Sequence, residues 1–367
     1  MGYYPDWVGT TFPPAKVDFT RFDWIDFAFA IPTSDCNLTW DDPSVAPGLL
    51  ASLVAAAHSK QKKVKLSIGG WTGSQHFSSS VNNTMARKKF VKNILAVYNQ
   101  FHLDGIDIDW EYPGHQGEGN NEVNPNDSAN FLAFLQLLRG ALPPPAAITA
   151  ATLNTPFFGA NGKPLKDVSN FAKVLDWILL MNYDVWGSSA NPGPNAPLYD
   201  GCHNSSQPDG NAVAGYEAWT AAGFPASKLV LGVPAYAYIS QSTATRLRTR
   251  RSPPGTVRLV GDGDQIQFRN LIKQGALVRS PARDNFGPIF SGAGGFTRYW
   301  DKCSSTPFLQ SPSASQVVTY DDVQSLGMKA AWTKEVGMLG VNIFDVHGDL
   351  DSWDLTDSVR RGLGLIR

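Results

Sequence analysis

The stretch Asp104-Gly105-Ile106-Asp107-Ile108-Asp109-Trp110-Glu111-Tyr112-Pro113 decides the fold. Its acidic residues alternate strictly with large apolar residues. Side chains on a strand switch faces at each residue and repeat about every 6.6 Å along one face. The three acids (Asp107, Asp109 and Glu111) should therefore point to one side and the apolar residues to the other. Tyr-Pro then ends the strand, which leaves Glu111 at a carboxyl end, where parallel α/β folds keep catalytic groups.

Three carboxyl groups held this close cannot all ionise freely. At least one should keep its proton to a higher pH, as a general acid needs to do near neutrality. A solvated acidic strand edge and a metal-ligand cluster are the alternatives. An exposed strand would not alternate with Ile, Ile and Trp, and no His accompanies the acids. The pattern thus favours an acid-catalysed, carbohydrate-cleaving site without a metal.

Composition limits the class of partner. With 367 residues the chain could form one large barrel or two domains. The net charge of −1 and the charged fraction of 17% argue against nucleic acid or an acidic membrane surface, because both call for basic patches. The 11 Trp residues suit sugar rings as well as a core. We expect an uncharged ligand, no nucleic-acid or membrane partner, and a monomer.

The cysteines and the glycosylation triplets bear on localisation. The three cysteines lie far apart and lack metal-ligand spacing. Three cysteines can form at most one disulfide, so one thiol remains, and the pairing stays open. Four Asn-X-Ser/Thr triplets fit a glycosylated, secreted, extracellular protein. No leader precedes Gly2, so we expect the signal peptide to be absent from this chain, either removed with Met1 added or lost through a late gene start. The cysteines are Cys36, Cys202 and Cys303, and the acceptors are Asn37, Asn82, Asn126 and Asn204.

Short apolar runs typical of strands recur along the chain, and helical patterns separate several of them. This alternation predicts a parallel sheet with right-handed crossovers. Eight such units close as an α/β fold of the (β/α)8 TIM-barrel type. The runs span residues 2–7, 24–30, 63–69, 105–110, 147–153, 177–183, 228–236 and 338–346, and the helical patterns span 47–59, 84–101, 127–139 and 210–222.

The spacing breaks once, between the seventh run and the eighth. There the sequence becomes rich in Gly, Pro, Ser and Arg but keeps aromatic residues that need a core. We expect residues 238–321 to form a small α+β insertion domain between strands 7 and 8, and residues 1–237 and 322–367 to form the catalytic barrel. The arginines of this segment predict a solvated turn; they are Arg246, Arg248, Arg250 and Arg251.

The chain resembles the family 18 glycoside hydrolases, the chitinase family, and its fungal branch in particular. The resemblance rests first on the signature DxxDxDxE, here Asp104 to Glu111, which stands at the fourth barrel strand in that family. It extends over almost the whole chain. The other matching segments are Ser67-Ile68-Gly69-Gly70-Trp71, Met181-Asn182-Tyr183-Asp184, Gly232-Val233-Pro234-Ala235-Tyr236 and Thr319-Tyr320-Asp321-Asp322.

The resemblance implies roles for the acids. Glu111 would protonate the glycosidic oxygen and later activate water, while the substrate's own 2-acetamido group attacks the anomeric carbon, as in substrate-assisted glycosidases. Asp109 would orient the acetamido N–H, and Tyr183 would hold the acetamido oxygen. Asp107 would share a proton with Asp109. As supporting groups, Tyr3 and Ser67 would hydrogen-bond Asp107. No cofactor is implied.

The resemblance also implies a sugar-binding surface. Trp71 would stack a sugar on the leaving-group side, although a core Trp after a Gly-Gly turn is the alternative. Two positions depart from the family. Phe344 stands where a Trp usually forms the floor under the cleaved sugar, and Tyr238 stands where an Arg is common. The other implied binding residues are Met181, Asp184, Tyr236, Trp186 and Trp332.

We therefore predict a chitinase that hydrolyses the β-1,4-N-acetylglucosamine linkages of chitin and chitooligosaccharides with retention. Two alternatives stay open. One is a weakened or inactive chitin-binding protein of the same fold, in which Phe344 and Tyr238 mark a cleft that grips but does not distort its ligand. The other is an endo-β-N-acetylglucosaminidase acting on N-glycans, which the expected insertion domain argues against.

Overall fold

The chain forms the predicted (β/α)8 barrel. The structure is a computed structural model that describes residues 1–241 and 255–366, so the predicted arginine turn lies outside the described residues. The barrel sheet has the order β1-β16-β8-β7-β6-β5-β4-β2-β3, and β1 also pairs with β2. Each of the eight predicted runs overlaps a barrel strand. The strands are β1 (Gly2–Pro5), β2 (Trp24–Pro32), β4 (Lys63–Gly69), β5 (Gly105–Asp109), β6 (Ala147–Thr152), β7 (Trp177–Leu180), β8 (Leu229–Pro234) and β16 (Gly340–Phe344), and β3 (Leu38–Trp40) adds an edge.

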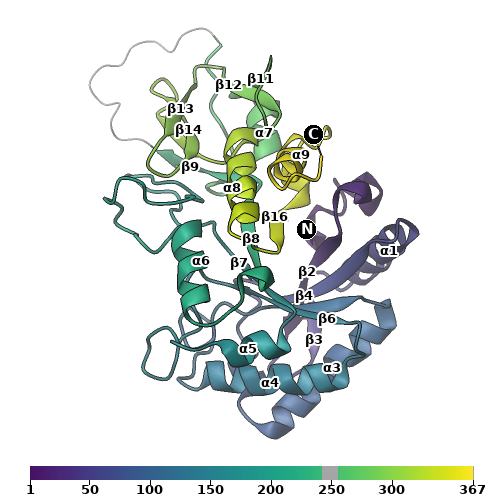
Figure 1. The fold of residues 1–367 in the computed structure, drawn as a ribbon. Coiled ribbons are helices and arrows are strands. Elements are labelled where there is room, and N and C mark those ends of the chain that lie inside the picture. Colours follow the sequence, from purple (N-terminus) through teal and green to yellow (C-terminus); the bar gives the residue numbers. More distant parts are fainter. Residues whose placement is uncertain (242–254, 367) are drawn as a thin grey trace. The chain divides into compact units, whose positions relative to one another are not determined.

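The described residues divide into two units, the first of which comprises residues 1–181 and 216–230. It holds the parallel run from β1 to β7. Helices α3 and α4 lie side by side in this unit (Figure 1). Helix α3 begins where the Asn83 side chain accepts the N–H groups of Met85 and Ala86, and it ends at His102, which has a left-handed backbone. Its helices are α1 (Ala46–Ser59), α2 (Phe77–Val81), α3 (Thr84–Phe101), α4 (Asp127–Ala141) and α5 (Ser169–Val174), and α6 (Ala212–Ala221) follows.

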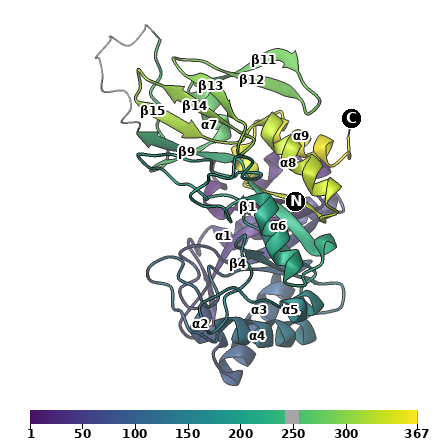
Figure 2. The same ribbon diagram turned by 60° about the vertical axis from the view of Figure 1, so that its left-hand side comes forward.

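The second unit comprises residues 182–215 and the described residues from 231 onward. Between β8 and β16 it holds strands and helices, as the α+β character of the insertion predicts. The domain limits at 238 and 321 stay a prediction. Strands β10, β9, β15, β14 and β13 form an antiparallel sheet, and the β11–β12 hairpin projects beyond it (Figure 2). The elements are β9 (Tyr236–Gln241), β10 (Gln265–Gln267), α7 (Phe268–Lys273), β11 (Leu277–Arg283), β12 (Pro288–Gly292), β13 (Thr297–Asp301), β14 (Thr306–Ser311) and β15 (Gln316–Thr319).

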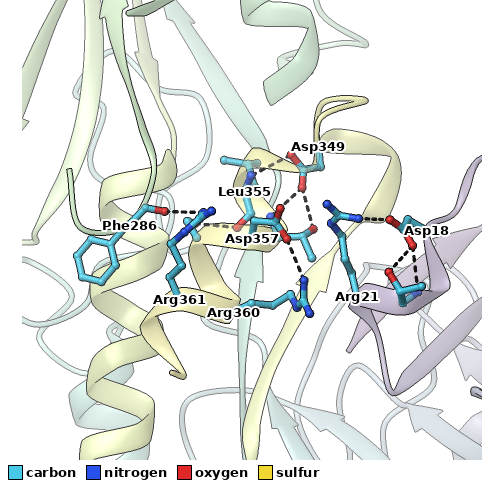
Figure 3. Close-up of polar contacts among 11 residues, drawn as sticks. Asp18, Arg21, Phe286, Asp349, Leu355, Asp357, Arg360 and Arg361 are labelled. Atoms are coloured by element: carbon cyan, nitrogen blue, oxygen red, sulfur yellow. Dashed lines mark hydrogen bonds and ion pairs between the residues drawn. The ribbon is translucent and has the colours of Figure 1, made fainter. Parts of the chain in front are cut away.

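Two helices, α8 (Val323–Glu335) and α9 (Asp354–Gly362), follow in the second unit. The buried Asp349 carboxylate accepts the N–H groups of Leu355 and Thr356 at 3.0 and 2.8 Å and so fixes the start of α9 (Figure 3). Burial raises the pKa of Asp349 to about 6. These bonds satisfy amides that the first turn of a helix leaves without partners.

One disulfide is present among the described residues, between Cys202 and Cys303, whose Cα atoms are 5.1 Å apart. Cys36 is a buried free thiol. The structure thus supplies the pairing that the sequence left open. All four asparagines of the glycosylation triplets are exposed. In the described part of the chain, no helix is both long enough and apolar enough to cross a membrane.

Candidate active site

Of the three acids of the opening motif, Asp107 lies in the middle of β5, Asp109 at its carboxyl end and Glu111 just beyond it. Asp107, Asp109 and Glu111 are only 2, 3 and 8% exposed. The alternating apolar residues are buried as well; Trp110 is 2% exposed and stacks on Phe77 with a centroid distance of 5.2 Å. Because both faces of this strand are buried, the acids are not a solvated strand edge.

Asp107 is surrounded by hydroxyl donors. In the strand register, Ser67 of β4 and Thr149 of β6 stand opposite Asp107 on its two sides. The hydroxyls of Tyr3 and Ser67 donate to Asp107 Oδ2 at 2.9 and 2.8 Å, and the Thr149 hydroxyl donates to Oδ1. Three donors on one carboxyl group fit an ionised carboxylate. The structure thus brings Tyr3 and Ser67 to the acid that they were expected to support.

A buried ion pair next to Asp107 was not predicted. Lys65 and Asp26 are each 1% exposed, and Lys65 Nζ lies 3.1 Å from Asp26 Oδ1 and 3.8 Å from Asp107 Oδ1. The same ammonium donates to the Thr149 hydroxyl at 2.7 Å. A signal existed in the sequence, because Lys65 and Ser67 share one face of β4 and Asp26 interrupts an apolar run.

Among the three acids, Asp109 is the one whose protonated form is favoured. Burial raises its pKa well above the usual range, and the nearby charges of Glu111, Asp107 and Asp26 raise it further. Among the described residues, Asp109 Oδ1 has no hydrogen-bond partner. A neutral Asp109 between two other acids can donate a proton to either neighbour, which is what the predicted proton sharing requires.

The backbone of Glu111 is held on both sides by residues that the sequence did not single out. Its N–H donates to Ser74 Oγ at 2.9 Å, and its carbonyl accepts from Asn121 Nδ2 at 3.0 Å. Asn121 Nδ2 also donates to the carbonyl of Trp71 at 2.9 Å. The Trp71 residue is 51% exposed and its ring meets that of Tyr112 edge to face, so it is not a core Trp.

The second unit brings together four of the aromatic residues that the sequence analysis singled out. The Tyr183 ring centroid lies 5.9 Å from that of Phe344 and 6.2 Å from that of Tyr236, and Tyr236 and Phe344 are 6.2 Å apart. Tyr238 joins them at 6.1 Å from Tyr236. We call these four residues the aromatic cluster. It combines aromatic rings with phenolic hydroxyls, the two kinds of group that sugars bind. Tyr183 and Phe344 are partly exposed, whereas Tyr236 and Tyr238 are buried.

Asp184 is bonded to two members of the aromatic cluster. The Tyr236 and Tyr238 hydroxyls donate to its Oδ1 at 2.5 and 2.7 Å. Its own N–H donates to Asn195 Oδ1 at 2.7 Å. Desolvation raises the pKa of Asp184, and the two hydroxyl donors lower it again in part. Tyr238, which stands where the family commonly has Arg, thus supplies a neutral donor in place of a charged one.

The remaining predicted residues are not members of the aromatic cluster. Met181, partly exposed, directly follows β7 and donates its N–H to the Thr152 carbonyl at 2.8 Å. Trp186 lines a cavity of about 270 Å³ together with Tyr199. Trp332 lies on α8 and is partly exposed. Within the described residues, no group of three or more His, Cys, Asp or Glu side chains could hold a metal ion.

Comparison with known proteins supports the family that the sequence motifs indicated. Proteins named chitinase-like effector from Moniliophthora roreri and Moniliophthora perniciosa are 37% and 34% identical to this chain; each match covers 99% of it, and 92% and 86% of the respective relative. The crystal structure of a Rhizomucor miehei chitinase matches with a TM-score of 0.78 at 31% identity, over 99% of both chains. The sequence model of glycosyl hydrolases family 18 matches residues 1–349. The chain belongs to glycosyl hydrolase family 18.

Proposed function

We propose that this protein is a chitinase that hydrolyses β-1,4-N-acetylglucosamine linkages of chitin and chitooligosaccharides with retention of configuration. One observation carries the proposal. Glu111 stands at the end of a buried row of acids in which the pKa of Asp109 is raised well above its usual range. Such a row can keep a proton available near neutral pH and deliver it where a glycosidic oxygen binds.

The proposed reaction has two steps. Glu111 gives its proton to the glycosidic oxygen while the acetamido oxygen of the substrate forms a bond to the anomeric carbon, so the bond to the leaving sugar breaks and an oxazolinium ion remains. The Glu111 carboxylate then removes a proton from water, which attacks the anomeric carbon and opens the oxazolinium ring. Because each step inverts the carbon, the configuration is retained.

Two further residues would hold the acetamido group during this reaction. Asp109 would face its N–H and compensate the positive charge of the oxazolinium ion as the Asp107–Asp109 proton moves toward Asp107. The Tyr183 hydroxyl would hold the acetamido oxygen in line with the anomeric carbon. A nucleophile already attached to the substrate needs only to be oriented, and this supplies the proximity advantage.

Substrate binding would use aromatic faces and one hydrogen-bonded carboxylate. Trp71, half exposed, would stack a sugar on the leaving-group side, and Phe344 would form the floor under the cleaved sugar. A Phe ring stacks over less area than a Trp and has no N–H to donate. The other proposed binding residues are Met181, Asp184, Tyr236, Trp186 and Trp332.

A second candidate function is chitin binding without efficient hydrolysis. Two observations favour it: the relatives that are 37% and 34% identical are named chitinase-like effectors, and Phe344 stands at the proposed sugar floor. A shallower floor would bind the sugar but distort it less, and distortion contributes several kcal/mol to glycosidase catalysis. The presence of Glu111 argues for the enzyme.

The test is hydrolysis of chitotetraose followed by proton NMR from the first minutes. The chitinase proposal predicts shorter oligomers whose new reducing ends are initially β. A cyclic thiazoline analogue of the oxazolinium ion should also inhibit, because it resembles the intermediate. Binding of chitohexaose without any shorter product would favour the second candidate. Release of N-glycans from a glycoprotein, with chitotetraose uncut, would favour the endo-β-N-acetylglucosaminidase instead.

We further propose that the protein is a secreted, monomeric glycoprotein. The Cys202–Cys303 disulfide supports secretion because such bonds persist in oxidising compartments. The exposure of all four asparagines of the triplets leaves them accessible to glycans. Expression in a eukaryotic host tests this: the secreted protein should lose mass on enzymatic deglycosylation and elute as a monomer.

A further inference from the structure

We infer that Asn121 is a positioning residue that fixes the spacing between the acid Glu111 and the stacking residue Trp71. The inference rests on the proposed function of these two residues. It gives a role to a buried side chain that touches neither the sugar nor the reacting atoms. Asn121 would act by holding the backbone of both residues with one amide group.

The hydrogen bonds of Asn121 determine how its amide is oriented. Asn121 is 6% exposed, and its Nδ2 donates to the carbonyls of Trp71 and Glu111 at 2.9 and 3.0 Å. Carbonyl oxygens only accept, so the amide nitrogen and not the amide oxygen must face them. The two hydrogen bonds of the amide group thus go to different loops, one that follows β4 and one that follows β5.

The Glu111 peptide is held from its other side as well. Ser74 is fully buried; its Oγ accepts the Glu111 N–H at 2.9 Å and donates to the Gly70 carbonyl at 2.8 Å. The loop also passes very close to the Glu111 carbonyl, since a Cβ added at Gly117 would stand 2.1 Å from that oxygen. The backbone that carries the acid therefore has little room to shift while these contacts are in place.

The neighbour of Asn121 ties the same two loops together. The Glu122 carboxylate contacts His76 Nδ1 at 3.0 Å and accepts the Ser79 N–H at 3.0 Å. The Glu122 N–H donates to the Gln75 carbonyl at 3.0 Å. These bonds fix the backbone of residues 121 and 122 against the segment that follows Trp71. Asn121 thus reaches toward Glu111 from an anchored position.

This arrangement has a specific chemical consequence. A sugar stacked on Trp71 is the leaving group whose oxygen Glu111 must protonate, so the two residues have to stand at one fixed separation. A misplacement of about 1 Å can lower the rate about 100-fold. An aryl leaving group such as 4-nitrophenolate needs little protonation and offers no sugar to Trp71. Loss of Asn121 should therefore slow sugar leaving groups much more than aryl ones.

The experiment compares Asn121→Ala and Asn121→Asp with a matched control, Asn93→Asp. Asn93 Nδ2 also donates to a backbone carbonyl, that of Cys36 at 2.8 Å, outside the acid row. We measure kcat/KM on chitotetraose and on 4-nitrophenyl chitobioside, well below the lowest melting temperature. Both Asn121 variants should lose about 100-fold on chitotetraose and much less on the aryl substrate, and the control should change neither.

Equal losses on both substrates, or no loss, would overturn the inference, because a purely structural role lowers both alike. If the Asn121 variants do not fold, Ser74→Ala tests the same backbone from its N–H side with the same expected selectivity. If the wild type hydrolyses neither substrate, the proposed function has failed. The role of Asn121 is then tested separately, by calorimetric measurement of chitohexaose binding. In that case Asn121→Ala should weaken chitohexaose binding relative to Asn93→Ala, and equal affinities would refute it.

Discussion

Replacing Asp107 by Asn removes one negative charge from the row of acids and, with it, the carboxylate toward which the Asp109 proton would move. The Tyr3 and Ser67 hydroxyls that now donate to Asp107 can turn and accept from the new amide, since a hydroxyl does both. Lys65 keeps its Asp26 partner at 3.1 Å. The variant should therefore fold. Its activity should fall because the proton acceptor is lost, and the pH at which the remaining activity declines should report the electrostatic effect.

The size of that effect follows from the strand. Acids on one face of β5 repeat about every 6.6 Å, and at an effective dielectric constant of about 20 one charge at that distance contributes about 2.5 kcal/mol. The charge of Asp107 helps to raise the pKa of Asp109, so removing it lets the row lose its proton at lower pH. The alkaline limb of the kcat/KM profile should move down by about 2 pH units, because each unit corresponds to about 1.4 kcal/mol.

The assay is the pH dependence of kcat/KM on chitotetraose for the wild type, for Asp107→Asn and for a control, Asp104→Asn. Asp104 precedes β5 and binds the Val64 N–H at 2.8 Å, away from the acid tip of the strand. The control should leave the alkaline limb in place. An alkaline limb that stays put or moves upward in Asp107→Asn would refute the electrostatic reasoning.

Three further changes test other parts of the account. Asp109→Asn should abolish hydrolysis and yet raise the melting temperature, more at pH 8 than at pH 4, as calorimetry can measure. Because the pKa of Asp109 is raised in the folded state, the free energy of unfolding of the wild type falls as pH rises above the pKa of the unfolded state. An Asn does not ionise, so the variant avoids that loss. Phe344→Trp should lower the KM for chitohexaose about fivefold, for about 1 kcal/mol of added stacking; an unchanged KM would remove Phe344 from the sugar floor. Cys303→Ser opens a disulfide that spans 101 residues and should lower the free energy of unfolding in urea by about 2–5 kcal/mol; an unchanged midpoint would contradict this.

The barrel could be predicted because its signals are local. Each barrel strand is a short apolar run bounded by turn residues, and the helices α1, α3, α4 and α6 all fall on predicted patterns. The alternation in β5 also predicted that three acids share one face. Short elements such as α2 and β3 were not predicted, because five or three residues carry too little periodicity to recognise.

The supporting residues of the site could not be predicted because they depend on contacts between distant segments. Thr149 meets Asp107 only through the register of β5 with β6. Asn121 is one of several asparagines in a polar loop, and its two acceptors are main-chain carbonyls that no sequence pattern marks. The Cys202–Cys303 pairing likewise depends on how the chain folds over the 101 residues between them.

The most direct test of the central claim is hydrolysis of chitotetraose and chitohexaose by the wild type beside Glu111→Gln, with binding of both oligomers followed by calorimetry. We predict that the wild type releases shorter oligomers, that Glu111→Gln releases none, and that the variant still binds chitohexaose, because Gln keeps the shape of the acid and loses only its proton. A wild type that binds chitohexaose but releases no product would contradict the account, as would a Glu111→Gln variant that cleaves at the wild-type rate.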